Sequence, residues 1–322
     1  MADLIYANPL GKEIGIVPYA EGDFTVGVNN NFSLNVPPDI GLAQDYRIMI
    51  EGMEFGGVID GIGVDTTQDY ITISGRTWQG ILESSIIRPN QGADYYTVSG
   101  DLNVIICTVI ARLGLEWCMV AETKASGYTV SNYQFTRYVN GYKGLRSLCR
   151  SVDCKLLFSY DPELRKVVLS AVKRGHYIDD GVDGENVDFS INTTRPVNHL
   201  IGLGKGELKD RAVVDVYTDA NGKLSATQKL FGAAHKADTY ESTSDEADKL
   251  LENTRKKILE LQDGLNTCKL ENIDGAKYDI DDIVGGTSIK HNVSVTTTIA
   301  QKIATISNDQ IVIETRTETE VS

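Results

Sequence analysis

The side chains that could perform chemistry in this chain are four histidines and five cysteines. They are His176, His199, His235, His291, Cys107, Cys118, Cys149, Cys154 and Cys268. No histidine belongs to an H-E-x-x-H motif, and no two cysteines form the C-x-x-C pair that zinc sites use. A Cys–His hydrolase assembled from distant residues stays open, because such residues meet in space and not in the chain. We predict no catalytic and no metal-binding residues.

A glycine-rich run, His199–Gly206, has the composition of a phosphate-binding loop. A dinucleotide loop needs G-x-G-x-x-G, and here the third glycine comes one residue early. A Walker A loop needs Gly-Lys followed by Ser or Thr, but Gly206 follows Lys205. We interpret the run as a strand whose glycines permit close backbone approach, and we predict no cofactor.

Two acidic segments could attract a cation. Asp179–Glu185 resembles a calcium loop, but the third loop position is Gly181 and the twelfth is Ser190, where the motif requires ligands. The other segment, Asp279–Asp282, contains three aspartates. Because the ligand pattern is incomplete, we predict a solvated turn in both places.

The elements that would position these residues are mainly strands. Short alternating runs, separated by Gly, Asn, Asp and Pro, fill the first part of the chain and return after Val187. In Tyr70–Ser74, for example, Ile71 and Ile73 share one face, as in a sheet with one side on a core. This spacing indicates antiparallel sheets or barrels.

Helical patterns interrupt the strands at three places. Asp101 and Gly114 are a suitable N-cap and C-cap for an amphipathic helix between them, and Thr243 with Glu246 has the form of a capping box. The predicted helices are Leu102–Leu113, Gly144–Val152 and Ser244–Gln262, and the predicted strands between the last two include Lys155–Tyr160 and Lys166–Val172.

We therefore predict a β-rich α+β chain with two antiparallel β-barrel domains, an inserted small α+β module and a peripheral amphipathic helix. The predicted boundaries are 1–95 for the first barrel, 96–180 for the module, 181–240 with 266–322 for the second barrel, and 241–265 for the helix.

Composition excludes several classes of function. The 322 residues carry 31 Lys and Arg against 45 Asp and Glu, a net charge of -14 that disfavours binding to DNA phosphates. No apolar run reaches the roughly 18 residues of a membrane-spanning helix, and the N-terminus lacks the basic and apolar regions of a signal peptide. We expect a chain without a membrane span that folds in a cytoplasm, with reduced cysteines in its core.

Two groups of segments resemble baseplate hub proteins of contractile phage tails. The first is Gly57–Asp65 followed by Tyr70–Leu82, a unit of strand, strand, Gly-Arg and short helix. The second comprises Asn198–Arg211, Tyr278–Gly286 and Ile299–Ile306. Their order is similar to that in the XkdQ-type hub of PBSX-like defective prophages and related tail-like bacteriocins. Asp281 departs from the family pattern, which has glycine in a Gly-Asp-Ile-Val turn.

The resemblance implies a homotrimer in which each subunit supplies two tube-like barrels to a ring of six. Such a trimer is an adapter between the hexameric tail tube and the trimeric central spike. The other implied partners are baseplate wedge proteins, a LysM-containing tail protein and the tape measure protein. The trimer would assemble in a bacterial cytoplasm and become part of the tail or baseplate of a virion or a released phage-tail-like particle. An acidic lumen would then repel passing DNA.

Two other functions stay open. A tail-associated cell-wall hydrolase would need a nucleophile or metal motif, which the sequence does not display. A carbohydrate-binding module for host recognition would need exposed aromatic platforms, which 15 Tyr and 2 Trp do not identify by themselves. We predict a structural protein and not an enzyme.

Overall fold

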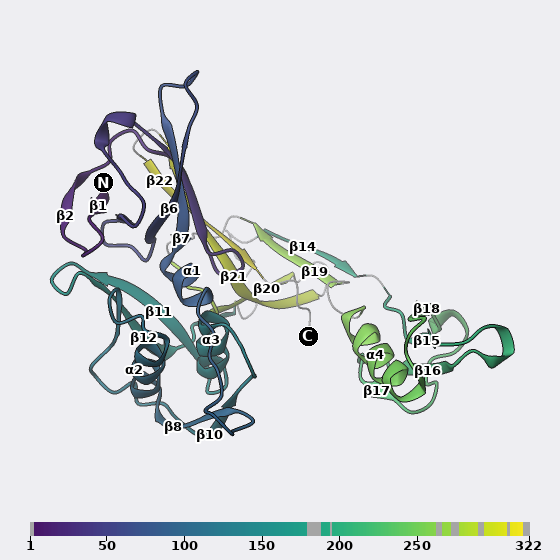
Figure 1. Ribbon diagram of the computed structural model, residues 1–322. Helices are drawn as coiled ribbons and strands as arrows, with labels where there is room; N and C mark the ends of the chain where they lie inside the picture. The colour runs from purple at the N-terminus through teal and green to yellow at the C-terminus, as the bar shows by residue number, and fades with distance from the viewer. Residues whose placement is uncertain are drawn as a thin grey trace. The chain divides into compact units, whose positions relative to one another are not determined.

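The computed structural model describes residues 3–178, 188–193, 195–261, 266–271, 277–288, 293–307 and 310–317 (Figure 1). Its contacts divide the chain into two compact units. The first consists of Met1–Val187 and Asn272–Thr317, and the second contains Asp188–Glu271. The predicted β-rich α+β class is confirmed. No helix in the described part of the chain is both long and apolar enough to span a membrane.

An eleven-stranded sheet is the main element of the first unit. Its strands are β1 (Leu4–Ala7), β2 (Glu13–Ile16), β3 (Glu21–Val26), β4 (Asn31–Val36), β5 (Arg47–Ile50), β6 (Gly56–Val64), β7 (Ile71–Thr77), β13 (His176–Ile178), β20 (Ile283–Ser288), β21 (Val293–Ser307) and β22 (Gln310–Thr317). They pair in the order β13-β20-β21-β3-β4-β7-β6-β5-β1-β2, with β22 also on β21. A short 3-10 helix, Pro38–Ile40, follows β4.

This sheet bends around one apolar core. Phe24, Leu34, Ile59 and Ile73 are fully buried there, together with Ala304 from the far end of the chain. Burial of Ile73 and partial burial of Ile71 confirm the alternation predicted for β7. The pairing of the described strands runs from β13 to β2 without joining its ends, so it does not amount to a closed barrel.

The last strands of the chain belong to this same sheet. β21 pairs antiparallel with β3, and Ile306 lies opposite Gly22. β20, β21 and β22, which were predicted to belong to one barrel with residues 181–240, thus share a sheet with the first strands of the chain.

An α+β module packs on the same unit. Its elements are α1 (Trp78–Glu83), β8 (Tyr96–Asp101), α2 (Leu102–Leu113), β9 (Met119–Ala121), β10 (Thr129–Phe135), α3 (Gly141–Arg150), β11 (Cys154–Asp161) and β12 (Lys166–Lys173). α2 has its predicted bounds, because Asp101 accepts a hydrogen bond from the Asn103 N–H and Gly114 adopts the left-handed C-cap. The second predicted helix is present but begins three residues earlier, at Gly141 after the Asn140 cap.

The second unit combines a small sheet with one helix. Its elements are β14 (Asp188–Thr193), β15 (His199–Leu203), β16 (Val213–Thr218), β17 (Leu224–Ser225), β18 (Ala237–Glu241), α4 (Ala247–Glu260) and β19 (Asn266–Glu271), with 3-10 helices at Leu208–Asp210 and Gly232–Ala234. β17-β16-β15-β18 form one sheet, and β14 pairs with β19. Leu250, Thr254 and Ile258 form the buried face of α4. The predicted capping box is wrong, because the helix begins after Glu246, whose side chain makes no cap hydrogen bond.

Candidate functional site

The strand, strand, Gly-Arg unit brings β6 and β7 unusually close together. A Cβ atom at Gly57 would lie 2.0 Å from the Arg76 carbonyl oxygen, and one at Gly75 would lie 1.9 Å from the Val58 carbonyl oxygen. Real side chains do not tolerate such distances, so only glycine fits at these two positions. The close approach of the two strands therefore explains why both positions of the unit are glycine.

Arg76 of this unit forms a bidentate ion pair with Asp60. Its Nε donates to Asp60 Oδ2 at 2.8 Å, and its Nη2 donates to Oδ1 at 2.7 Å. Hydrogen bonding from Arg76 lowers the pKa of the Asp60 carboxyl below its ordinary value. Both side chains remain over one-third exposed, so the pair contributes little to stability and leaves charged groups on the sheet surface.

α1 connects the strand, strand, Gly-Arg unit to the other elements of the α+β module. The Thr77 hydroxyl accepts a hydrogen bond from the Gly80 N–H at 3.3 Å, which caps the helix. Trp78 is only 1% exposed and stacks on Tyr160 of β11, with 6.1 Å between the ring centroids. The Gly-Arg unit is thus a joint between the sheet and the module.

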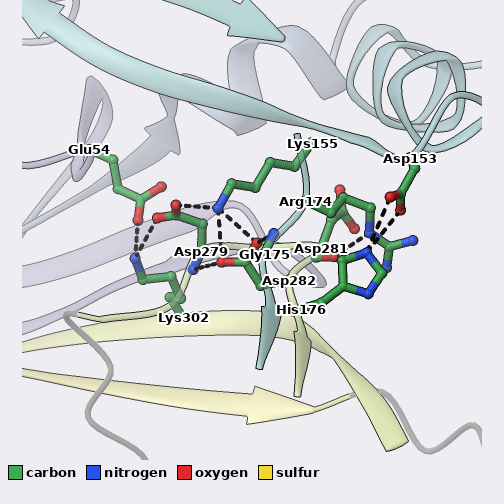
Figure 2. Close-up of polar contacts among 10 residues, drawn as sticks. All are labelled: Glu54, Asp153, Lys155, Arg174, Gly175, His176, Asp279, Asp281, Asp282 and Lys302. Carbon is green, nitrogen blue, oxygen red and sulfur yellow. Dashed lines mark hydrogen bonds and ion pairs between the residues drawn. The ribbon is translucent and has the colours of Figure 1, made fainter. Parts of the chain in front are cut away.

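A buried network of charges surrounds the acidic segment before β20 (Figure 2). Lys155 Nζ donates to Asp279 Oδ2 at 2.6 Å and to Asp282 Oδ1 at 2.7 Å. Burial favours a lower pKa for Lys155, but hydrogen bonds to the two carboxylates raise its pKa overall. Asp282 is fully buried and also accepts a hydrogen bond from the Gly175 N–H at 2.6 Å.

Asp281 is the centre of the second half of the network. Its carboxylate accepts hydrogen bonds from Arg146 Nη2 at 2.5 Å and from Arg150 Nε at 2.7 Å, both on α3. Its main-chain carbonyl accepts one from Arg174 Nε at 2.6 Å. Burial favours a higher pKa for Asp281, but the two arginines lower its pKa overall.

Lys302 of β21 extends the network to the turn before β6. Its ammonium, with a side chain 5% exposed, donates to Glu54 and lies 3.6 Å from Asp279 Oδ1. The network links α3, β11, the β5–β6 turn and the C-terminal strands within the first unit. Figure 2 shows the contacts of Lys155 and Lys302. The network fixes the C-terminal strands to the module.

The solvated turn predicted at Asp279–Asp282 is therefore wrong. Asp281 is 1% exposed, and the acidic oxygens bind ammonium and guanidinium groups of the same chain. Burying charges is unfavourable unless they are paired, and these are paired. Lys155 and Lys302 were not predicted as members of this site. The available signal was a lysine at an inward position of an apolar strand.

The backbone at Asp281 explains its departure from the resemblance. Its φ is +76°, the left-handed region that glycine adopts without strain. Aspartate tolerates this region better than most residues, and here its carboxylate also pairs with the arginines. Asp281 thus keeps the turn and adds two ion pairs to it.

The three histidines within the described residues do not assemble into one site. In the second unit, His199 Nε2 lies 2.7 Å from Asp215 Oδ1, and His199 Nδ1 lies 3.1 Å from His235 Nε2. In the first unit, His176 contacts Asp153. His291 lies outside the described residues. No group of three or more His, Cys, Asp or Glu among the described residues could hold a metal.

Three of the five cysteines lie in the core, as predicted. Cys118, Cys149 and Cys154 are buried free thiols, whereas Cys107 is exposed on α2. Burial raises the pKa of Cys118 to about 12 and that of Cys154 to about 11. A nucleophilic cysteine needs the opposite shift. The side chain of Cys268 lies outside the described residues.

The first five residues of the glycine-rich run form a strand, β15, as predicted for the run. Gly202 lies within β15, and a Cβ there would meet Thr254 Oγ1 of α4 at 2.2 Å. At Gly204 it would meet the Asp245 carbonyl oxygen at 2.6 Å. The glycines let α4 approach the strand. The other acidic segment, Asp179–Glu185, lies outside the described residues.

A phage tail protein of solved structure has a similar fold. Prophage tail protein gp18 from Listeria monocytogenes aligns with a TM-score of 0.50 at 14% identity, over 99% of this chain and 94% of that chain. A tail protein from Neisseria meningitidis gives a TM-score of 0.47 at 14% identity, over 98% and 96%. A chain of the phage P2 baseplate gives 0.48 at 10% identity, over 99% of each. No protein-family model and no curated protein matches the sequence. The chain thus has a fold in common with a phage tail protein.

Proposed function

We propose that this chain is the structural baseplate hub of a contractile tail, from a phage or a tail-like bacteriocin. Three copies would form an adapter between the hexameric tail tube and the trimeric central spike. The proposal is supported by a fold similar to that of a prophage tail protein over nearly the whole chain. Two tube-like bodies in each subunit would supply the six positions of the ring.

The observation that carries the proposal is the large sheet with unpaired edges. β2 and β22 each pair on one side only among the described strands. Ile14 and Ile16 of β2 are 50% and 54% exposed, and Val312 of β22 is 55% exposed. Free strand edges with exposed apolar side chains promote aggregation unless another chain covers them. Neighbouring copies in a ring would cover them.

One face of this sheet suits the wall of a tube. Ser33, Ser74 and Asp23 are exposed side by side on β4, β7 and β3, and Thr305 of β21 donates to Asp23 at 2.6 Å. Such a face is polar, and its carboxylates repel phosphate. In the proposed ring this face would line the lumen.

We propose no enzymatic role. The buried thiols have pKa values raised by burial, and the acidic segment before β20 is occupied by Lys155 and the α3 arginines. A zymogram on peptidoglycan should show no clearing, and a glycan array should show no binding. Clearing would favour the cell-wall hydrolase, and glycan binding would favour the host-recognition module.

The copy number tests the proposal directly. Light scattering and electron microscopy of the purified full-length protein, alone and mixed with the spike protein encoded nearest to it, should show three copies per particle. A ring in the images would support the adapter role. A strict monomer under both conditions would contradict it.

A further inference from the structure

A basic and aromatic pocket lies at the start of α3. Its volume is about 340 Å³, and its walls include Tyr133, Arg137, Tyr138 and Lys143. No acidic residue lines it. Neither cation forms an ion pair with the described residues, although the whole chain has a net charge of -14. The pocket is therefore a local positive site on an acidic protein.

Tyr138 stands at this pocket in an unusual conformation. Its φ is +56°, a value that bulky residues rarely adopt, and 57% of the residue is exposed. The Arg137 guanidinium lies 5.4 Å from the centroid of its ring. Strained residues concentrate at functional sites, and exposed Tyr and Arg side chains together are typical of the centres of protein interfaces.

The hairpin tip of β6 and β7, residues 64–70, has the complementary chemistry. Val64 and Tyr70 are 70% and 39% exposed, and Asp65 and Asp69 are exposed acidic residues beside them. The hairpin projects beyond the rest of the sheet (Figure 1). A two-stranded projection has little stability of its own, so it would gain from being covered.

We propose that the hairpin tip of one copy docks into the pocket of a second copy. Asp65 and Asp69 would face Arg137 and Lys143, while the apolar tip side chains would meet the pocket tyrosines. None of the tip residues lines the pocket of its own chain. This inference rests on the proposed function, because it assumes that copies of the chain associate with one another. Because the contact joins two different surfaces, it can repeat head to tail, and it forms a ring when the rotation between successive copies closes.

The test combines charge reversal with charge exchange. The pocket variant is Arg137→Glu with Lys143→Glu, and the exchange variant adds Asp65→Lys and Asp69→Lys to the same chain. A matched control, Lys209→Glu with Lys229→Glu, changes two exposed lysines of the second unit. Circular dichroism first verifies that each full-length variant is folded, and sedimentation velocity then measures self-association.

The pocket variant should associate at least about tenfold more weakly than the wild type, because like charges would then meet at the contact. The exchange variant should recover to within about threefold of the wild type, and the control should match the wild type. Recovery separates a direct contact from a loss of local structure.

Failure of this inference differs from failure of the proposed function. If the wild type is a trimer and the pocket variant is still a trimer, the docking contact alone is overturned. The same holds if the exchange variant does not recover the trimer that the pocket variant has lost. An assembly of another copy number that responds to both variants supports the contact and contradicts the trimeric hub. The pocket variant could also associate like the wild type but lose binding to a phosphodiester polymer. That result would show that the pocket binds the polymer, and it would overturn the inference.

Discussion

At the scale of residues, most of the specific chemistry of this chain is the pairing of buried charges. Asp281 and Asp282 are almost fully buried and are held by Arg146, Arg150 and Lys155. Paired burial of this kind gives little net stability against an apolar alternative, but removing one partner leaves an unpaired charge in the interior. Such a network defines which segments pack together.

Replacing Asp281 separates its two roles. Asp281→Gly keeps the left-handed backbone but leaves Arg146 and Arg150 without their carboxylate, so we expect a loss of about 3 kcal/mol in the free energy of unfolding. Asp281→Ala should lose roughly 1 kcal/mol more, because alanine is strained at a φ of +76°. Urea unfolding of the three proteins measures both differences. Equal stability of the glycine variant and the wild type would contradict the role of the carboxylate.

The pH dependence of stability should follow the same residues. Because the folded state lowers the pKa of Asp281, its contribution is present above the unfolded pKa of about 3.9 and is lost as pH falls through the lower, folded pKa. Because the folded state raises the pKa of Lys155, its contribution is present below the unfolded pKa of about 10.4 and is lost as pH rises through the higher, folded pKa.

Thermal unfolding between pH 7 and pH 3 measures the acidic limb. The stability advantage of the wild type over Asp281→Asn should shrink below about pH 4, where the Asp281 carboxylate of the unfolded state takes up a proton and that of the native state, with its lower pKa, does not. An advantage that stays constant down to pH 3 would contradict the assigned ion pairs.

Thiol reactivity is a further prediction at this scale. Iodoacetamide at pH 8, followed by peptide mass spectrometry, should label Cys107, which is exposed on α2. Cys118 should stay unlabelled in the folded protein, because burial raises its pKa to about 12 and blocks access. Labelling of Cys118 as fast as Cys107 would show that the core of the module opens readily.

At the scale of elements, steric limits connect the sheet to the module. β6 and β7 approach so closely at Gly57 and Gly75 that a methyl group would meet a carbonyl oxygen. Thr77 caps α1 directly after this crossing, and Trp78 is buried against Tyr160. A local sequence pattern thus sets the path of the chain from a strand into a helix.

Two glycines on β6 give a matched test of this crossing. Gly57→Ala would place a methyl group 2.0 Å from the Arg76 carbonyl oxygen and should lower the free energy of unfolding by about 3 kcal/mol. Gly63→Ala has its nearest contact at 3.7 Å and should change it by less than about 0.5 kcal/mol. Denaturant unfolding compares the two variants, and equal effects would contradict the steric argument.

At the scale of the whole molecule, the net charge determines whether the protein binds charged polymers such as DNA. The net charge is -14, and carboxylates such as that of Asp23 lie on the exposed sheet face. We expect no retention of double-stranded DNA at about 0.15 M salt, because phosphate binding requires clustered cations. Filter binding measures this. If the filter retains DNA, and Arg137→Glu with Lys143→Glu abolishes that retention, the DNA binds at the α3 pocket.

The sequence by itself determined the elements whose signals are local. The caps of α2, the alternation in β7 and the strand at His199–Leu203 follow from residues close together in the chain. The capping box before α4 failed, because Thr243 and Glu246 satisfy a pattern that several backbone conformations can produce.

Only the tertiary structure decided which distant segments meet. Asp281 and Arg146 are 135 residues apart, and no local pattern encodes their pairing. Pairing of β21 with β3 likewise depends on hydrogen bonds that any two strand edges can form, so the choice follows from core packing and from charges that must be paired when buried. An acidic segment that looks solvated in sequence thus becomes the buried link between the module and the C-terminal strands.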